Sequence, residues 1–392
     1  MAPHDRDEML RDGDAGTVPD LVRRYEKMHA LYPQLPYFTA RLGDLFRYMG
    51  SEALAVVFYT KAKDDLYELG DDDDVLNNLV LELGMQALTV ATSFVAGPYH
   101  QTWRATALHD FPSILPLPDG HEDFRREWLA IRRSDPEMVQ MYTRKLVIDS
   151  NYLEGIFRLT DESVNDIIRK GVAEGRADCE SVSSITDPVK AKAILNDMLS
   201  VYDVIFEIAD KQRPIHKDLL CKLHRQFMDT CRFVADNCYV ASGITRSETL
   251  RTSIIRGEYP IQLCPYADVD KELVYICNYT NANMQLKWKN PFAAASWLHL
   301  VLVRCHPFED GNGRLSRMIA SLPLLQNGYP PISLSLSLQE EYHRAIGKAY
   351  FGDHGPLAAV FLKGMQESLA VVQALFYAAF VSILTLKEIW LP

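Results

Sequence analysis

Residues 306–317 read His-Pro-Phe-Glu-Asp-Gly-Asn-Gly-Arg-Leu-Ser-Arg and lie between two apolar stretches, 291–305 and 318–325. Both flanks are rich in Ala, Leu and Val and poor in helix breakers, so we expect two buried helices. The Gly-Asn-Gly triplet interrupts them and predicts a loop that leads into the second helix. Backbone N–H groups at the start of that helix, beside glycines that permit close approach, would form an anion site.

The side chains of this loop suit phosphate chemistry. Arg314 and Arg317 are three residues apart, so on a helix they share a face and can grip two parts of one phosphate chain. Asp310 offers one hard oxygen ligand, which suits Mg²⁺ when substrate phosphates and water complete its shell. His306 can accept the proton of an attacking hydroxyl, because imidazole titrates near neutral pH. Phe308 is expected to pack beneath the loop.

Other interpretations explain fewer of these residues. Asn-Gly is also a hairpin-turn signal, and a single histidine beside a helix end is more often structural than catalytic. An EF-hand is excluded, because Arg314 stands at the third chelating position and Ser321 where the bidentate glutamate belongs. A zinc site lacks a second His or Cys at ligand spacing, and neither a P-loop nor a kinase catalytic loop is present. Phosphate transfer therefore accounts best for the whole stretch.

The stretch resembles the signature of the Fic (filamentation-induced-by-cAMP) family, His-Pro-Phe-x-(Asp/Glu)-Gly-Asn-Gly-Arg-x-x-Arg, at every fixed position. The resemblance implies an enzyme that moves AMP from ATP to a Ser, Thr or Tyr hydroxyl of a protein target and releases pyrophosphate. It implies His306 as general base and Asp310 as the ligand of Mg²⁺. It also implies a nucleotide- and phosphate-binding set formed by Gly311, Asn312, Gly313, Arg314 and Arg317.

A shorter segment, Ser150-Asn-Tyr-Leu-Glu154-Gly155, gains meaning from this resemblance. Its Ser and Glu are four residues apart, so both point from one face of a helix, and Gly155 leaves room beside the acid. Alone, the segment is typical of an exposed glutamate near a helix end. It resembles the family's inhibitory motif, (Ser/Thr)-x-x-x-Glu-(Gly/Asn), which implies that Glu154 pairs with Arg317 and denies it to the γ-phosphate of ATP. A carboxylate there could also position a water that removes AMP.

Residues 250–264 predict a β-hairpin, because β-branched residues flank a Gly-Glu-Tyr-Pro turn. In the family such a flap binds an extended segment of the protein target by strand addition. The resemblance therefore implies a target-docking edge formed by Thr252, Ser253, Ile254 and Ile255.

The base pocket is less well matched. By register, Tyr342 corresponds to a family tyrosine at the adenine, whereas Tyr350 stands where an Asn is common. Tyrosine can stack on a base, but it cannot reproduce the paired donor and acceptor of an amide. Transfer of UMP or phosphocholine by the same fold therefore stays an alternative to transfer of AMP.

The region before the inhibitory motif has helical spacing of apolar residues, and one stretch from Pro36 fits a tetratricopeptide repeat. Its small and apolar positions are Leu42, Gly43, Phe46, Ala55, Tyr59 and Ala62. A weaker second repeat from about Gly70 fits only through Leu76 and Ala96. The acidic run 71–74 is expected to cap the next helix. A plain helical hairpin without a binding role is the alternative.

The composition indicates a globular chain with an acidic balance. Of the 392 residues 48 % are hydrophobic, and the net charge of −11 argues against a nucleic-acid partner, because phosphate backbones require basic patches. Seven scattered cysteines indicate reduced thiols and a cytoplasmic location. The stretch 369–386 carries no charge and predicts a buried terminal helix, with a membrane tail anchor as the alternative.

We therefore expect an all-α protein with a Fic helical core and a short β-hairpin flap. The expected order is a disordered arm at 1–17, a tetratricopeptide-like helical region at 18–110, a linker and connecting helix at 111–149, a Fic domain with the inhibitory motif at 150–368, and an apolar C-terminal helix at 369–392. A homodimer is compatible with the sequence. A repeat-based adaptor whose Fic loop is inert is the alternative outside enzymology.

Overall fold

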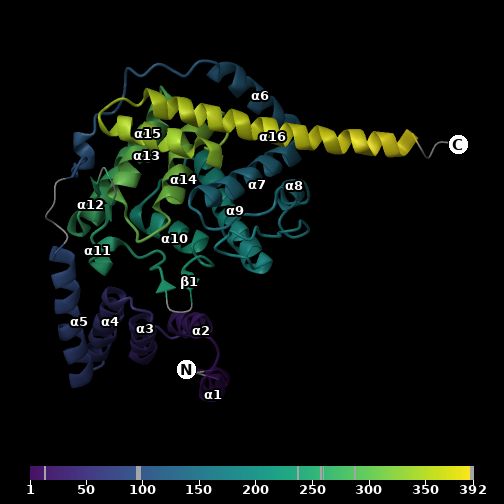
Figure 1. Ribbon diagram of the computed structural model, residues 1–392. Coiled ribbons are helices and arrows are strands. Elements are labelled where there is room, and N and C mark those ends of the chain that lie inside the picture. The colour runs from purple at the N-terminus through teal and green to yellow at the C-terminus, as the bar shows by residue number, and fades with distance from the viewer. Residues whose placement is uncertain are drawn as a thin grey trace. The chain divides into compact units, whose positions relative to one another are not determined.

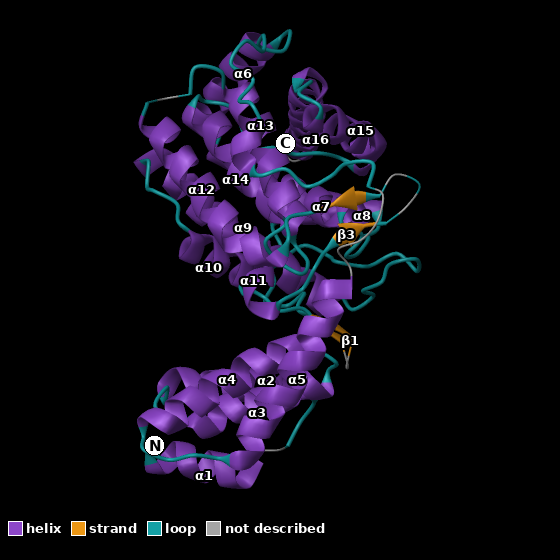
Figure 2. Cartoon of the chain, turned by 90° about the vertical axis from the view of Figure 1, so that its left-hand side faces the viewer, coloured by secondary structure: helices purple, strands orange, loops and turns teal. Residues whose placement is uncertain are grey.

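The chain folds almost entirely into α-helices, as its sequence predicts. The computed structural model describes residues 1–12, 15–93, 99–235, 238–256, 258, 260–286 and 288–388. Within these residues, strands occur only as two short antiparallel hairpins, drawn in orange in Figure 2. The chain divides into two compact units (Figure 1): unit 1 comprises Met1–Trp103, Cys231–Asp270 and Pro307–Asp310, and unit 2 comprises Arg104–Thr230, Lys271–His306 and Gly311–Pro392.

Unit 1 contains the N-terminal helices and both hairpins. Its elements are α1 (Pro3–Asp12), α2 (Val18–Leu31), α3 (Pro36–Tyr48), α4 (Glu52–Glu68), α5 (Asp74–Ser93), β1 (Phe233–Ala235), β2 (Cys238–Tyr239), α11 (Arg246–Thr249), β3 (Ile254–Ile255) and β4 (Ile261–Gln262).

The pair α3 and α4 carries the residues that fit the repeat pattern. All six are buried between the helices of unit 1: Leu42, Gly43, Phe46, Ala55, Tyr59 and Ala62. A Cβ at Gly43 would stand 2.6 Å from the ring of Tyr59, so only glycine allows the two helices to approach this closely. The residues that fit the repeat pattern thus lie where α3 and α4 pack closely, whereas assignment to the tetratricopeptide family stays a prediction. Ala96, from the weaker repeat, lies outside the described residues.

The N-terminal arm is not disordered as predicted, because residues 3–12 form α1. Tyr32 is the C-cap of α2. Its hydroxyl accepts a hydrogen bond from the N–H of Ala2 at 2.8 Å and donates one to Asp5. These contacts are polar and join residues far apart in the chain. The helix therefore has no periodic apolar pattern from which it could be predicted. The cap predicted for the acidic run is confirmed, since Asp73 Oδ1 accepts from the N–H of Val75 at 2.8 Å.

The hairpin of β1 and β2 is not predicted by the sequence analysis. Phe233 and Tyr239 belong to the core of unit 1, and the Tyr239 ring centroid lies 4.8 Å from that of Phe46. Residues that the sequence analysis places inside one Fic domain at 150–368 therefore pack with the N-terminal helices.

Unit 2 contains the motif helices and those that surround them. Its elements are η1 (Thr106–Leu108), α6 (His121–Ser134), α7 (Pro136–Leu153), α8 (Asp161–Lys170), α9 (Pro188–Lys211), α10 (Lys217–Phe227), most of α12 (Tyr266–Gln285), α13 (Pro291–Cys305), α14 (Asn312–Gln326), η2 (Leu336–Leu338), α15 (Gln339–Tyr350) and α16 (Gly355–Glu388). Nearly every side chain of α13 and α14 is buried. These are the two buried helices predicted on either side of the motif loop.

The apolar C-terminal stretch is the continuation of α16, which begins at Gly355 and not near residue 369 as predicted. The helix continues through Gly364 and past residue 369 without a break. Leu369 and Val372 are buried, while Val371 and Tyr377 are exposed. None of the helices in the described part of the chain combines the length and the apolar character needed to cross a membrane. Residues 389–392 lie outside that part.

Candidate active site

The motif loop connects the end of α13 to the start of α14. His306 follows the last residue of α13 with φ 47° and ψ 59°, a left-handed conformation that few residues other than glycine adopt. Its N–H still donates to the carbonyl of Leu302 at 2.9 Å. The chain therefore leaves α13 at the candidate base, whose side chain is partly exposed.

Two glycines allow close approach to the first turn of α14. Gly311 is the N-cap with φ 74°, and a Cβ there would stand 3.0 Å from His224 Nε2. A Cβ at Gly313 would stand 2.3 Å from Glu154 Oε1. The carboxylate of Glu154 therefore lies directly against the start of α14, beside the buried Asn312, where the helix dipole favours a negative charge.

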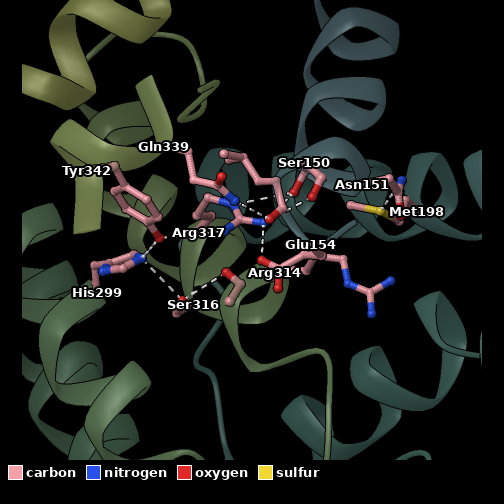
Figure 3. A network of polar contacts seen from close by, with 12 residues as sticks. Ser150, Asn151, Glu154, Met198, His299, Arg314, Ser316, Arg317, Gln339 and Tyr342 are labelled. Carbon is pink, nitrogen blue, oxygen red and sulfur yellow. Dashed lines mark hydrogen bonds and ion pairs between the residues drawn. The ribbon is translucent and has the colours of Figure 1, made fainter. Parts of the chain in front are cut away.

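Arg317 contacts the predicted inhibitory segment at the end of α7, as Figure 3 shows. Its Nη2 donates to Glu154 Oε1 at 2.8 Å and to Ser150 Oγ at 2.9 Å. The same nitrogen lies 3.2 Å from the Ser150 carbonyl oxygen. The ion pair predicted between Glu154 and Arg317 is present, and Ser150 faces the same guanidinium from one turn earlier.

Both members of this pair are charged at neutral pH. Burial favours a neutral carboxyl, but Arg317 and Arg314 outweigh it and hold the pKa of Glu154 below its usual value of 4.5. Burial also disfavours the charged guanidinium, yet Glu154 and Tyr342 raise the pKa of Arg317 above its usual range. The Arg317 side chain is 2 % exposed and that of Glu154 is 24 % exposed, so water screens this ion pair only in part.

Gly155 has a different role from the one predicted. A Cβ at this position would meet nothing within 4 Å, so the room predicted beside the acid is present but does not depend on the missing side chain. Its φ of 67° is left-handed, and it directly follows Glu154, the C-cap of α7. The glycine therefore ends the helix immediately after the carboxylate.

Arg314 contacts a different helix from Arg317. Its guanidinium carbon lies 5.3 Å from the ring centroid of Phe227, and its Nη2 lies 3.1 Å from the sulfur of Met228, both at the end of α10. The guanidinium groups of the two arginines thus contact different helices, and their joint grip on one phosphate chain stays a prediction. Their Cβ atoms have helical spacing, but the long side chains turn toward different neighbours.

Tyr342 points its hydroxyl into the core. The Tyr342 Oη lies 2.7 Å from His299 Nε2 and 3.5 Å from Arg317 Nη1. His299 is not among the predicted site residues, because a single histidine in an apolar helix is ordinarily a core residue. The hydroxyl predicted to serve the adenine is thus bonded to Arg317, the predicted phosphate ligand, and to a histidine.

Tyr350 is packed against two cations. The guanidinium carbons of Arg104 and Arg304 lie 4.6 and 4.7 Å from its ring centroid, and Tyr350 is 3 % exposed. These distances are typical of cation–π contacts. The ring predicted as a stacking surface for a base is therefore buried among arginines, which explains why a tyrosine is accommodated there.

The segment Pro307–Asp310 groups with unit 1. Phe308 is fully buried, as expected, and Glu309 pairs with Arg251 at 3.2 Å. Asp310, the candidate magnesium ligand, is partly exposed. In the described chain no three-ligand cluster of His, Cys, Asp or Glu includes it. A cation at Asp310 would take most of its ligands from phosphate and water, which is the coordination that Mg²⁺ accepts.

The predicted flap is present as the hairpin of β3 and β4, in which Ile254 pairs with Gln262 and Ile255 with Ile261. Of the four predicted docking residues, Thr252 and Ser253 precede the strand, while Ile254 and Ile255 form it. A parallel bridge joins Ile261 to residue 101, so β4 has neighbours on both sides and β3 is the outer strand of the described hairpin. Gly257 and Tyr259 of the predicted turn lie outside the described residues.

A buried arginine fixes the base of this flap. Arg246 is 1 % exposed, and its two terminal nitrogens donate to the carbonyls of Arg251 and Cys264, each at 2.8 Å. Its backbone N–H donates to the carbonyl of Pro307 at 2.8 Å. Arg246 therefore ties both ends of the hairpin to the motif segment within unit 1. The sequence gives no signal for this role, because it depends on carbonyl groups.

Comparison with known proteins supports the assignment of the motif. The sequence profile of the Fic/DOC family matches residues 214–324, a range that lies within the predicted 150–368. Residues 214–324 are a Fic domain. Among solved structures, a Fic domain containing signaling protein from Bacteroides thetaiotaomicron superposes with a TM-score of 0.51 and 18 % identity, over 64 % of this chain and 94 % of that one. This likeness confirms the predicted Fic fold.

Two curated relatives share a shorter segment. Protein adenylyltransferase fic-1 of Caenorhabditis elegans is 34 % identical over 80 residues, which are 20 % of this chain and 16 % of that protein. Protein adenylyltransferase Fic of Drosophila persimilis is 37 % identical over 80 residues, with the same shares of the two chains. The match thus spans less than one fifth of either relative.

Proposed function

We propose that this chain is a protein adenylyltransferase, which moves AMP from ATP to a Ser, Thr or Tyr hydroxyl of a protein target. The observation that supports this most strongly is the complete motif of residues 306–317, in a chain that shares a segment with proteins named protein adenylyltransferase. The target's hydroxyl oxygen forms a bond to the α-phosphorus of ATP. The bond from that phosphorus to the bridging oxygen of the β-phosphate breaks, pyrophosphate leaves, and His306 accepts the hydroxyl proton.

The start of α14 is the proposed phosphate site. Gly311 and Gly313 permit close approach, and Arg314 and Arg317 supply two buried positive charges. Charges already removed from water stabilise a developing negative charge more strongly than exposed ones, because no solvent must reorganise during the reaction. We propose β3 as the edge to which an extended segment of the target adds.

Mg²⁺ is the proposed cofactor, with Asp310 as its protein ligand. The ion would neutralise charge on the phosphates and on the leaving pyrophosphate. A single, partly exposed carboxylate fits this cation, because Mg²⁺ usually binds through one or two carboxylates together with substrate phosphates.

Glu154 is the proposed inhibitor of transfer. Its carboxylate lies 2.8 Å from Arg317 Nη2 and against Gly313, so it holds both the arginine and the space that a phosphate would need. A nucleotide whose γ-phosphate binds Arg317 must first displace this carboxylate. The same position would allow Glu154 to direct a water at an AMP-modified hydroxyl, which is the proposed route for AMP removal.

The test measures AMP incorporation into the full chain by intact mass after incubation with ATP and Mg²⁺. Glu154→Ala is expected to raise incorporation at least about tenfold, because the carboxylate no longer competes for Arg317. Glu137→Ala is the matched control, since Glu137 lies on the same helix and pairs with Arg144. Adding His306→Ala to the Glu154 variant is expected to abolish incorporation.

Three results would contradict parts of this proposal. An unchanged rate in Glu154→Ala rules out inhibition by that residue, and incorporation that survives without His306 rules out the base. A mass increase with UTP or CDP-choline but none with ATP would assign the chain to another transfer reaction.

A further inference from the structure

A cluster of three buried polar side chains lies beside Arg317 in unit 2 (Figure 3). It consists of His299 on α13, Tyr342 on α15 and Ser316 on α14, which are all at most 4 % exposed. Burying polar atoms among apolar residues is unfavourable unless hydrogen bonds compensate for the lost water. Three such residues from three helices beside one arginine therefore indicate that their hydrogen bonds, and not only their packing, have a role.

The hydrogen bonds of this cluster have one consistent direction. Arg317 can only donate, so the Tyr342 oxygen accepts from its Nη1 and directs its own proton to His299 Nε2 at 2.7 Å. Ser316 Oγ also lies 3.3 Å from His299 Nε2, but its proton is donated to the Gly313 carbonyl at 2.9 Å, which leaves the Tyr342 hydroxyl as the donor to that nitrogen. Burial, with the nearby Arg317 and then His343, lowers the pKa of His299 to about 3, so the imidazole is neutral and can accept.

His299 is poorly satisfied at its other nitrogen. Its Nδ1 is buried and has no hydrogen-bond partner among the residues that the structure describes. Nearly all buried polar atoms in proteins find a partner, so a histidine that leaves one nitrogen unsatisfied contributes little net stability. The polar contact that His299 does make is through Nε2, which orients the Tyr342 hydroxyl.

The two ends of the Arg317 guanidinium are held by different helices. Nη2 is bound by Ser150 and Glu154 of the α7 segment, whereas Nη1 faces Tyr342 of α15. Withdrawal of Glu154 would leave the Tyr342 side of the guanidinium intact. The arginine would then stay in place and not follow the carboxylate.

We propose that Tyr342 and His299 are positioning residues that hold the Nη1 side of Arg317, so that a phosphate can replace Glu154 on the Nη2 side without rearrangement of the guanidinium. The inference rests on the proposed function, because ATP supplies that phosphate. It gives Tyr342 a role at the phosphate chain in place of the adenine role that the family register implies.

The test compares binding of ATP and AMP to the full chain by calorimetry, in the presence of Mg²⁺ and in the Glu154→Ala background. AMP is the discriminating ligand, because it lacks the β- and γ-phosphates. Tyr342→Phe and His299→Leu are each expected to weaken ATP binding about tenfold, equivalent to about 1.4 kcal/mol, and to leave AMP binding within about twofold. His299→Gln is expected to restore most of the ATP affinity, since its amide oxygen can accept from Tyr342.

Two results would overturn the proposal. Equal losses for ATP and AMP would assign Tyr342 to the nucleoside, and unchanged ATP affinity would show that the Nη1 contact is idle. If the Glu154 variant binds neither nucleotide, the proposed function fails. The positioning of Arg317 by Tyr342 is then tested in the protein without a ligand. A crystal structure of Tyr342→Phe is then expected to show a displaced Arg317 guanidinium, and an unmoved guanidinium would refute the role.

Discussion

Removing the carboxylate of Glu154 is the perturbation whose energetic effect the structure predicts most directly. Glu154→Ala deletes the carboxylate that pairs with Arg317, whose side chain is 2 % exposed. Leaving a buried charge without its partner typically costs about 3–5 kcal/mol. The loss should be smaller here, about 1–3 kcal/mol, because Ser150 and Tyr342 still accept from the guanidinium and Glu154 is partly exposed.

The assay is urea denaturation followed by circular dichroism on the wild type, Glu154→Ala and Glu154→Gln. Glutamine keeps an acceptor oxygen but no charge, so its stability is expected to fall between the other two. ATP with Mg²⁺ is expected to stabilise the alanine variant more than the wild type, because a phosphate then fills the vacated place beside Arg317. A variant as stable as the wild type, with the same response to ATP, would refute the reasoning about this ion pair.

Three further outcomes follow from the packing and charges. Gly313→Ala should lower ATP affinity at least about tenfold even when Glu154 is already alanine, because a Cβ blocks the first turn of α14; calorimetry that finds no loss contradicts a phosphate site there. The wild type should be more stable than Glu154→Gln by a constant free energy above pH 4.5, and this difference should decline as the pH falls further, because the folded state lowers the pKa of Glu154. Urea denaturation of both proteins at several pH values measures the difference. A difference that instead disappears above neutral pH would contradict the prediction. Gly43→Ala should destabilise unit 1 by about 1–3 kcal/mol, because the new Cβ clashes with Tyr59. The control Gly84→Ala, whose Cβ would lie 4.0 Å from Val56 Cγ1, should be neutral or stabilising in thermal melts. Equal effects of the two substitutions would contradict the close pairing of α3 and α4.

Local sequence predicts the parts of this molecule that depend on local residues. The Gly-Asn-Gly triplet between two apolar runs predicts a loop and a helix start, and α14 begins at Asn312. The pairing of Glu154 with Arg317 follows from the family resemblance and is present at 2.8 Å. Neither residue type alone specifies the other, because 163 residues separate them.

Other features depend on packing between distant segments, and the sequence does not predict them. Tyr342 reaches His299 across 43 residues, and only the arrangement of α13 and α15 shows that the hydroxyl faces the core. Arg246 binds carbonyl oxygens, which every residue possesses, so no side-chain pattern marks its partners. Helix α1 likewise depends on one hydroxyl of Tyr32, which is a single polar contact and not a periodic pattern.

The left-handed Gly155 follows Glu154, the C-cap one residue beyond the end of α7, and has open space around it. Helix ends open at far lower free energy than whole units, because few hydrogen bonds and little buried surface are lost. The final turn of α7 is not such a lightly held end, because Ser150, Asn151 and Leu153 are buried. Release of Glu154 through this turn would therefore also expose buried side chains of unit 2, so the ion pair with Arg317 and the packing of α7 are coupled in energy.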